Sequence, residues 1–374
     1  MDTIVRVPAL LGSALAALAL AGCVFAPPAA DEQVPEQVTA APAGPDPSAP
    51  RLPPLDTRFV AIDPADDVIG EPQVLFTRYE NTFTAIAQVY KLGYEEMRRA
   101  NPGVDHWLPG EGTPVYLPTQ KILPDAPRDG IVVNVASMRL MYFAPQPAKD
   151  GEPERLEVAS HAIGIGREGW STPLGEAKVT GKVRDPAWYP PASIRAEHAA
   201  AGDPLPAIVP PGPDNPLGPL AMTLSLPSYL IHGTNKPAGV GMRSSHGCIR
   251  MYNEDIEVLF GRAERGTPVY IVNQPVLAGW RGDELYLEVN RPLEEDDIDL
   301  AAEAERVLEK ALSKPGAPAV TLDREAIAKI VAEQRGIALP VSRPGLDPDH
   351  YLAQARIIEN TVPVDEREQT ADAQ

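Results

Sequence analysis

The chain has 374 residues, a formal net charge of −19 and a hydrophobic content of 44%. This length and apolar content suffice for two or three domains with buried cores, which excludes a chain that is disordered throughout. The negative charge argues against nucleic acid and anionic lipid as partners, because both polyanions would repel the protein.

Residues 1–22 have the pattern of an export signal. Arg6 precedes an uncharged apolar run over residues 7–20, which is too short to span a membrane comfortably. The sequence LAGC at 20–23 resembles a bacterial lipobox, which implies cleavage before Cys23 and a lipid on its thiol. The resemblance implies a periplasmic protein of a Gram-negative bacterium, held at the outer membrane through this lipid anchor alone.

Plain secretion without lipid is the alternative, because residues 24–26 also offer a small-residue cleavage site. The chain has only two cysteines, so lipidation or removal of Cys23 leaves Cys248 without a disulfide partner. An unpaired thiol outside the cytoplasm is a candidate nucleophile, and a buried inert cysteine is the alternative. Residues 23–72 are rich in proline and alanine and predict an extended tether.

Residues 73–119 predict a small βααβ unit. With Ala100-Asn101-Pro102 and a later Leu-Pro-Gly at 108–110, the unit resembles a LysM module, which implies binding of cell-wall glycan. A packing domain without ligand is the alternative, since Glu80-Asn81 replaces the usual glycine-aspartate opening. The expected elements are strand 74–76, helix 82–90, helix 94–100 and strand 113–118.

Residues 130–273 are rich in β-type runs and predict a mainly-β domain. A helix is expected at 253–261, whereas the dense prolines of 186–219 argue against regular structure there. The expected strands are 131–135, 139–143, 157–165, 178–183, 220–224, 229–231 and 269–272.

A partly helical C-terminal extension is expected over residues 274–359, followed by a polar, disordered tail over 360–374. The extension should contain a strand at 284–289 and helices at 297–312 and 323–335. The predicted fold class is therefore multidomain α+β, with the small unit, the mainly-β domain and the extension in that order. We expect the small unit and the chemistry to work as separate domains.

The segment from 231 to 251 places Cys248 near two histidines. A neighbouring imidazole can lower a thiol pKa from about 8.5 into the range of roughly 3.5–7.5. His232 ends a predicted strand, and a loop carbonyl, that of Gly233, can fix the tautomer of its ring. His246 lies two residues before Cys248, and an extended backbone would put both side chains on one face.

The His-Gly-Thr opening and the later Ser-His-Gly-Cys resemble the L,D-transpeptidase catalytic domain, also called YkuD. Residues 164–175, 188–191 and 209–218 resemble the subgroup that includes the Braun-lipoprotein-linking enzymes. The resemblance implies that Cys248 accepts the acyl group, that His232 is the base and that the Gly247 and Cys248 amides stabilise the oxyanion. It also implies a catalytic place for His246 and Gly233.

The resemblance further implies substrate contacts. Arg250 is a candidate for a substrate carboxylate, with a structural salt bridge as the alternative. No cofactor is expected, because the glycine cluster at 164–169 lacks the βαβ setting of a dinucleotide site. No metal is expected either, because no metal-ligand spacing accompanies the histidines. The other candidate contacts are Ser245, Thr234, Arg243 and Trp188.

The implied reaction releases D-alanine from a peptidoglycan tetrapeptide stem. Cys248 would attack the diaminopimelate carbonyl, and an amine would resolve the thioester. The amine is either that of another stem, which gives a 3-3 cross-link, or a lysine of an outer-membrane lipoprotein. A hydrolytic relative that detaches wall-linked lipoprotein and a non-catalytic peptidoglycan-binding lipoprotein are the alternatives.

Overall fold

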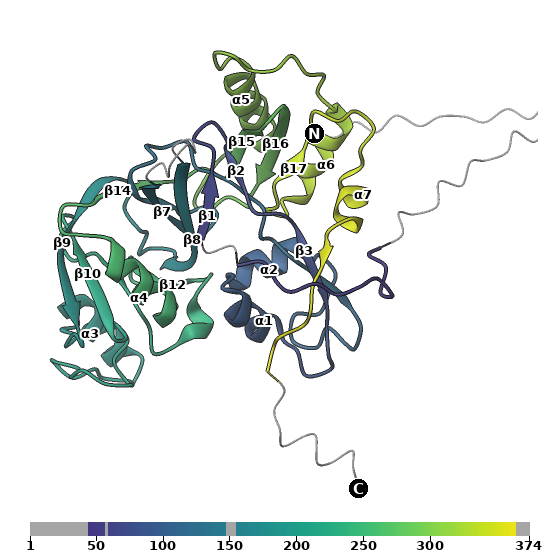
Figure 1. The fold of residues 1–374 in the computed structure, drawn as a ribbon. Helices are drawn as coiled ribbons and strands as arrows, with labels where there is room; N and C mark the ends of the chain where they lie inside the picture. Colours follow the sequence, from purple (N-terminus) through teal and green to yellow (C-terminus); the bar gives the residue numbers. More distant parts are fainter. Residues whose placement is uncertain (1–43, 57–58, 147–154, 364–374) are drawn as a thin grey trace, which may run out of the picture. The chain divides into compact units, whose positions relative to one another are not determined.

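The computed structural model describes residues 44–56, 59–146 and 155–363 (Figure 1). The expected signal peptide, Cys23 and the first part of the tether lie outside the described residues. From Pro42 onward the chain clusters into one compact unit. Among the described helices, none is long and apolar enough to cross a membrane.

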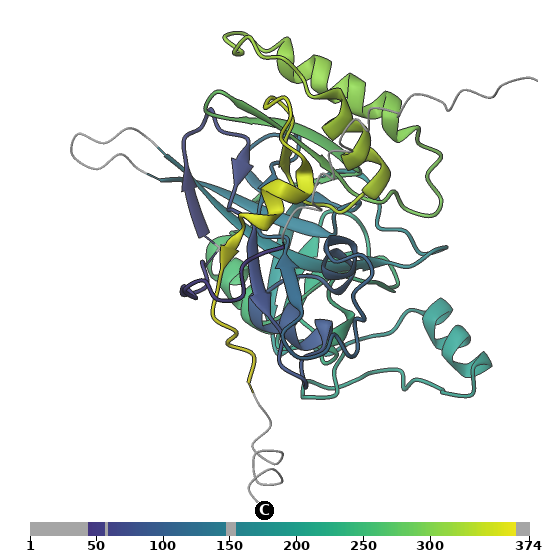
Figure 2. The ribbon, with the colours of Figure 1, turned by 90° about the vertical axis from the view of Figure 1, so that its right-hand side faces the viewer.

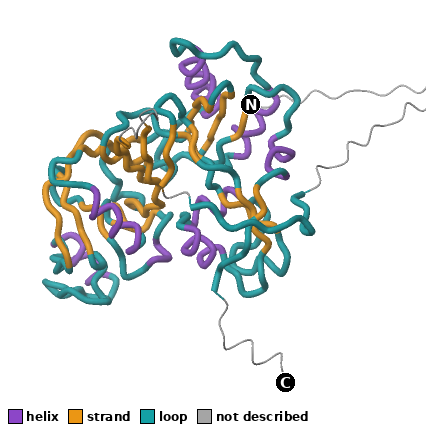
Figure 3. Tube along the Cα trace, viewed as in Figure 1, coloured by secondary structure: helices purple, strands orange, loops and turns teal. Residues whose placement is uncertain are grey.

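The largest sheet confirms the mainly-β domain. Its strand order is β1-β8-β13-β11-β10-β9-β14-β6-β7, and β7 also pairs with β8, so the strands from β8 round to β7 form a closed ring. Figure 3 shows these strands gathered in orange. The strands are β1 (Phe59–Ile62), β6 (Gly130–Asn134), β7 (Arg139–Gln146), β8 (Arg155–Gly166), β9 (Gly175–Arg184), β10 (Leu220–Leu224), β11 (Leu230–His232), β12 (Arg243–Ser245), β13 (Ile249–Met251) and β14 (Pro268–Val272).

Strand β8 links two parts of this ring. It pairs with β7 along residues 155–162 and with β13 at 163–164, and β12 also lies on it. Helix α4 (Asn253–Arg262) follows β13, as the sequence predicts, and places Ile256 in the same buried cluster as Ile231 and Met251. Burial of each such side chain contributes about 1.5–3 kcal/mol. The β11–β13 part of the sheet is therefore well anchored.

The proline-rich stretch 186–219 contains helix α3 (Ala192–Ala200), which corrects the expectation of no regular structure. Figure 2 shows this stretch extending from the sheet with α3 at its end. Only Ile194 of the helix is buried. The helix therefore lacks the apolar stripe that predicts an amphipathic helix from sequence.

The small unit has the strand–helix–helix–strand order that the sequence predicts. Thr82 begins its first helix by accepting a hydrogen bond from the Ala85 amide (3.1 Å). The left-handed backbone of Lys91 ends the helix. The elements are β3 (Gln73–Phe76), α1 (Phe83–Tyr90), α2 (Tyr94–Ala100) and β4 (Pro114–Leu117).

The C-terminal extension is a small sheet with helices packed on it. The strand and the two longer helices agree with the prediction, whereas the outer strands and the last helix are additional. The elements are β15 (Val276–Arg281), β16 (Glu284–Val289), β17 (Leu339–Pro340), α5 (Leu300–Leu312), α6 (Arg324–Glu333) and α7 (Pro348–Ala353).

The predicted tether ends earlier than residue 72. Strand β1 pairs with β8, and β2 (Val68–Ile69) pairs with β5 (Lys121–Ile122). The side chains of Ile62 and Val68 are buried. Residues 59–72 thus belong to the folded part, because their apolar residues find a surface that composition alone does not reveal.

The predicted tail also begins later than residue 360. Strand β18 (Arg356–Ile357) adds to β3 in parallel, and the Asn360 side chain donates to the Phe76 carbonyl (3.0 Å). Val362 is buried. These residues extend the sheet of the small unit, while residues 364–374 lie outside the described residues.

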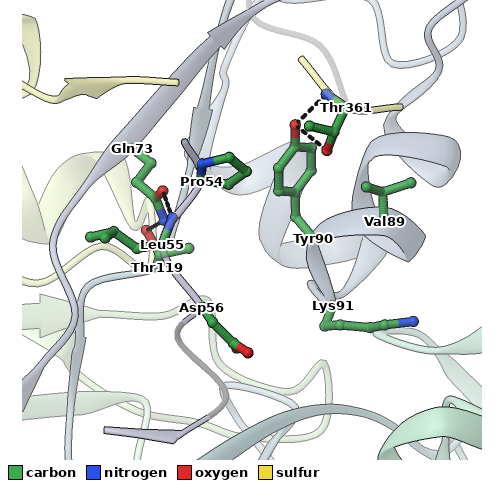
Figure 4. A pocket seen from close by; sticks show the side chains of 9 residues that line it. All are labelled: Pro54, Leu55, Asp56, Gln73, Val89, Tyr90, Lys91, Thr119 and Thr361. Carbon is green, nitrogen blue, oxygen red and sulfur yellow. Dashed lines mark hydrogen bonds between the residues drawn. The ribbon is translucent and has the colours of Figure 1, made fainter. Parts of the chain in front are cut away.

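A pocket of about 250 Å³ lies where the N-terminal stretch, α1 and the C-terminal segment meet (Figure 4). The Tyr90 hydroxyl accepts from the Thr361 amide (2.9 Å) beside it. None of its lining residues comes from the closed sheet. The lining residues are Pro54, Leu55, Asp56, Gln73, Val89, Tyr90, Lys91, Thr119 and Thr361.

A buried charged network joins the small unit, the closed sheet and the extension. The Lys121 ammonium donates to the Gly336 carbonyl (2.9 Å) and lies 3.3 Å from a Glu96 carboxylate oxygen. The Arg139 guanidinium approaches the other Glu96 oxygen at 3.5 Å. These three charged side chains are at most 6% exposed. Loss of one partner would leave a buried charge uncompensated.

We predict that Lys121→Met lowers the free energy of unfolding by about 3–5 kcal/mol, because it removes one of the two cations that compensate the buried Glu96 charge. Urea denaturation of the full chain measures the change. Lys310→Met is the matched control, since the Lys310–Asp125 pair is more than half exposed and should contribute less than about 1 kcal/mol. Equal losses in the two variants would contradict a structural role for the network.

Candidate active site

The site is built on two neighbouring parallel strands. In the β11–β13 pairing, Ile231 lies opposite Ile249 and His232 opposite Arg250. Paired residues point to the same face of a sheet. Cys248 lies two residues before Arg250. The register therefore places His232 beside Arg250 on one face, two residues from Cys248, while contact between Cys248 and His232 stays a prediction.

The His232 ring is buried and held in one tautomer. Its Nδ1 lies 2.6 Å from the Gly233 carbonyl oxygen, as the sequence predicts, so Nδ1 carries the hydrogen and Nε2 is left as the acceptor. The Asn253 side chain holds the backbone two residues after His232, because it accepts a hydrogen bond from the Thr234 amide (2.8 Å). Burial, and next the Arg250 charge, lower the pKa of His232 to about 4.

The Cys248 thiol donates a hydrogen bond to a backbone carbonyl. Its Sγ lies 3.7 Å from the Ser228 carbonyl oxygen, which accepts its hydrogen. Burial raises the pKa of Cys248, although a hydrogen bond from the Leu230 backbone and the Arg250 charge act the other way. The expectation of a lowered thiol pKa is therefore wrong for this state. Burial thus shifts both the Cys248 thiol and the His232 imidazole toward their neutral forms.

The turn before Cys248 requires glycine. Gly247 has a φ of +100°, and a Cβ there would meet a Tyr229 ring carbon at 2.7 Å. The Ser245 hydroxyl donates to the Cys248 carbonyl (2.6 Å) and accepts from the Gly247 amide (3.2 Å). The Thr172 hydroxyl donates to the Gly247 carbonyl (2.9 Å). The Gly247 amide is thus engaged inside the turn, which leaves its oxyanion role a prediction.

The His246 side chain contacts residues outside the β11–β13 pair. Because Gly247 is left-handed, the backbone is not extended between His246 and Cys248, and the expectation of a shared face is wrong. The His246 ring packs edge-on against Trp170, with centroids 4.8 Å apart, and its Nε2 lies 3.1 Å from a Glu197 oxygen. Burial lowers the pKa of His246 against the opposing effect of Glu197.

Among the described residues, Arg250 has no carboxylate within ion-pair distance. Its Nη1 donates to the Ser244 hydroxyl (3.1 Å), and its guanidinium lies over Gly239. Arg243 differs, because Glu294 and Glu295 of the extension bind it at 2.9 and 2.6 Å. The structural alternative for Arg250, a salt bridge, is therefore not found in the part of the chain that the structure describes.

The remaining candidates have partners within the protein. The Thr234 hydroxyl accepts from the Lys236 amide (2.9 Å), and its side chain is buried. Trp188 pairs through its backbone with Val209 at the base of the α3 stretch. Substrate contact by Thr234, Ser245, Arg243 and Trp188 stays a prediction.

Comparisons with known proteins agree with this geometry. The model of the L,D-transpeptidase catalytic domain, YkuD, matches residues 128–271. The probable L,D-transpeptidase YbiS of Escherichia coli strain K12 is 44% identical over 230 residues, 60% of this chain and 72% of that protein. The probable L,D-transpeptidase ErfK/SrfK of Salmonella typhimurium is 37% identical over 292 residues, 75% of this chain and 90% of that protein.

The chain belongs to the L,D-transpeptidase family. A third relative, the probable L,D-transpeptidase YcfS of Escherichia coli strain K12, is 38% identical over 269 residues, 71% of this chain and 81% of that protein.

Sequence reasoning missed three residues that shape this L,D-transpeptidase site. Asn253 holds the backbone after His232, Thr172 holds the Gly247 carbonyl, and Glu197 binds His246. Asn253 and Thr172 have a signal in sequence, since each lies close to a motif residue or in a segment typical of the family. Glu197 has none, because its helix lacks apolar periodicity.

We predict that kcat/KM for acylation decreases as the pH falls through about 4, the pKa of His232. Above this value Nε2 is unprotonated and can accept the thiol proton, and below it Nε2 cannot. His232→Ala should lower the neutral-pH rate by about two to four orders of magnitude. Stopped-flow acylation across the pH range measures both quantities.

The same variant provides the control on mechanism. Without a base, only the ionised thiol reacts, so the rate in His232→Ala should climb with pH into the alkaline range, because the pKa of Cys248 is raised. A wild-type rate that climbs in the same way would mean that His232 is not the base.

Proposed function

We propose that this L,D-transpeptidase carries out cysteine-dependent acyl transfer on peptidoglycan tetrapeptide stems. L,D-transpeptidases act on peptidoglycan stem peptides, which makes the stem the donor substrate. The proposal is supported by the β11–β13 register, which puts His232 beside the strand that follows Cys248, and by the His232 tautomer, which the Gly233 carbonyl holds so that Nε2 can accept a proton. Cys248 has a proton to give, and His232 is the base that we propose takes it.

The first step forms the thioester. Cys248 Sγ bonds to the carbonyl carbon of the third stem residue, diaminopimelate, while its proton passes to His232 Nε2. The tetrahedral oxyanion accepts hydrogen bonds from the turn, with the Cys248 amide as the donor that we propose. The C–N bond to D-alanine then breaks, and His232 returns the proton to the leaving amine.

The second step transfers the acyl group to an amine. The acceptor nitrogen attacks the thioester carbonyl, His232 takes a proton from it, and Cys248 leaves and regains its proton. A stem amine gives a 3-3 cross-link, a lipoprotein lysine gives a wall-linked lipoprotein, and water gives hydrolysis. Export and lipid attachment at Cys23 stay predictions for the part of the chain outside the described residues.

Arg250 is the proposed anchor for a substrate carboxylate. Its guanidinium is partly buried beside His232 and Cys248, and Ser244 is its hydrogen-bond partner. A stem that ends in D-alanine presents a carboxylate close to the scissile bond. Such a charged hydrogen bond contributes about 1.5–3 kcal/mol to binding.

We also propose that the small unit binds cell-wall glycan. Three large side chains of its loops are exposed: Tyr79 at 70%, Trp107 at 58% and Leu108 at 63%. The loops are tied together, because the Tyr79 amide donates to the Glu111 carboxylate (2.7 Å). Exposed aromatic faces suit the C–H faces of sugar rings, and a surface of this kind marks an interaction site.

The alternative function is that of a wall-binding lipoprotein whose β domain is not catalytic. Incubation of the full chain with tetrapeptide muropeptides, followed by intact-mass spectrometry, separates the two. We expect the wild type to gain the acyl group with loss of D-alanine and Cys248→Ala to gain nothing. The masses of the released products identify the acceptor.

Acylation in Cys248→Ala would overturn the mechanism, and an unmodified wild type would favour the alternative function. Arg250→Gln is the matched variant in the same assay. Its KM should rise by about tenfold or more, as expected for one lost charged hydrogen bond, while saturating substrate still acylates Cys248.

We predict that Trp107→Ser weakens binding to isolated sacculi by about tenfold, the usual loss for one aromatic contact. Acylation of a soluble muropeptide should not change. Ile208→Ser is the control, because Ile208 is another exposed apolar residue, at 50%, but lies in the α3 stretch. Equal sacculus binding by wild type and Trp107→Ser would contradict glycan binding by the small unit.

A further inference from the structure

The turn between α1 and α2 lies against the loop that joins His232 to Cys248. The amides of Tyr94 and Glu95 donate to the carbonyls of Val240 (3.4 Å) and Gly241 (3.1 Å). These amides open α2, where helical partners are lacking. The catalytic loop therefore supplies the acceptors for the start of a helix in the small unit.

The carbonyl groups of the same turn are also bound. The Tyr252 hydroxyl, which follows β13 directly, donates to the Leu92 carbonyl (2.9 Å), and this contact is buried. The Arg139 guanidinium donates to the Lys91 carbonyl (3.3 Å). Tyr252 directly follows β13 and Arg139 begins β7, so donors at the ends of two strands of the closed sheet hold the turn.

Two glycines make the contact close. A Cβ on Gly93 would lie 2.8 Å from the Gly241 Cα, and a Cβ on Gly241 would lie 2.1 Å from the Gly93 Cα. Gly93 has a φ of −89°, a conformation open to any residue. The approach of the catalytic loop, rather than the backbone conformation, is therefore what requires glycine at 93.

The opposite side of the loop rests on β8. The Gly241 amide donates to the Ile163 carbonyl (3.1 Å), and the Ile165 amide donates to the Met242 carbonyl (3.1 Å). Gly239, at the other end of this stretch, lies under the Arg250 guanidinium, since a Cβ there would meet Nη1 at 2.4 Å. A shift of the loop therefore moves the surface on which Arg250 rests and the segment that leads to Cys248.

We propose that the α1–α2 turn positions the acyl-transfer site, with Gly93 and Tyr252 as positioning residues. This inference rests on the proposed function of Cys248 and adds a catalytic role to a unit that we otherwise assign to glycan binding. It is an alternative to the expectation that the small unit and the chemistry work separately. The turn holds residues 239–242 against β8, and this placement sets the geometry between His232 and Cys248.

The test compares Gly93→Ala with Gly103→Ala in the full chain. Gly93→Ala adds a contact with the catalytic loop, whereas Gly103→Ala strains a left-handed glycine (φ +82°) that has no atom within 4 Å of its Cβ position. With soluble muropeptide, Gly93→Ala should lower kcat by about 10- to 100-fold, as expected for a displacement of about 1 Å. Its KM and its sacculus binding should stay within about twofold.

Gly103→Ala should keep the wild-type kcat even if its melting temperature falls as much as that of Gly93→Ala. Tyr252→Phe provides a second route, because it removes the hydrogen bond to Leu92 without adding bulk, and should lower kcat by about tenfold. It decides the question if Gly93→Ala does not fold. An acylated wild type with unchanged kcat in both Gly93→Ala and Tyr252→Phe would overturn the positioning role, and a wild type without acylation would instead refute the proposed function.

Discussion

The parallel pairing of β11 with β13 is the constraint on which the site depends. Parallel neighbours cannot be joined by a tight turn, so the chain between His232 and Cys248 must leave the sheet and return. Here the connection contains no long helix, and its regular elements are the short 3₁₀ turn η1 (Pro237–Gly239) and strand β12. The connection needs surfaces on both sides, which β8 and the α1–α2 turn provide.

The electrostatics of the pair follow from the same enclosure. Burial disfavours charge on both partners, so it raises the pKa of Cys248 and lowers that of His232. An imidazolium–thiolate pair would need stabilising charges, and the nearby Arg250 opposes the imidazolium. Burial therefore favours the neutral thiol of Cys248 over its thiolate.

Local patterns in the sequence predicted much of this fold. Alternation placed the strands from β6 to β11 and β14, and the His-to-Cys motif predicted the bond between His232 and the Gly233 carbonyl. The errors have a common physical origin in contacts between distant segments. Strand β18 completes the sheet of β3, and Glu197 reaches His246 from a helix without an apolar stripe.

Conformation at a single glycine accounts for the remaining error. The spacing of His246 and Cys248 predicts a shared face only if the backbone between them is extended, and Gly247 at φ +100° breaks that condition. The sequence shows a glycine there but not the Tyr229 ring that excludes any side chain. Such a steric requirement becomes visible only when the folded neighbours are known.

The ion pair between Arg243 and Glu295 has a consequence for the response of the protein to acid. The hydrogen bond and charge of Arg243 lower the pKa of Glu295 to about 2. The carboxylate therefore keeps its charge in acid that would protonate most carboxyl groups, and β12 stays tied to the C-terminal extension. This ion pair should therefore persist at a pH at which His232, with a pKa of about 4, is already protonated.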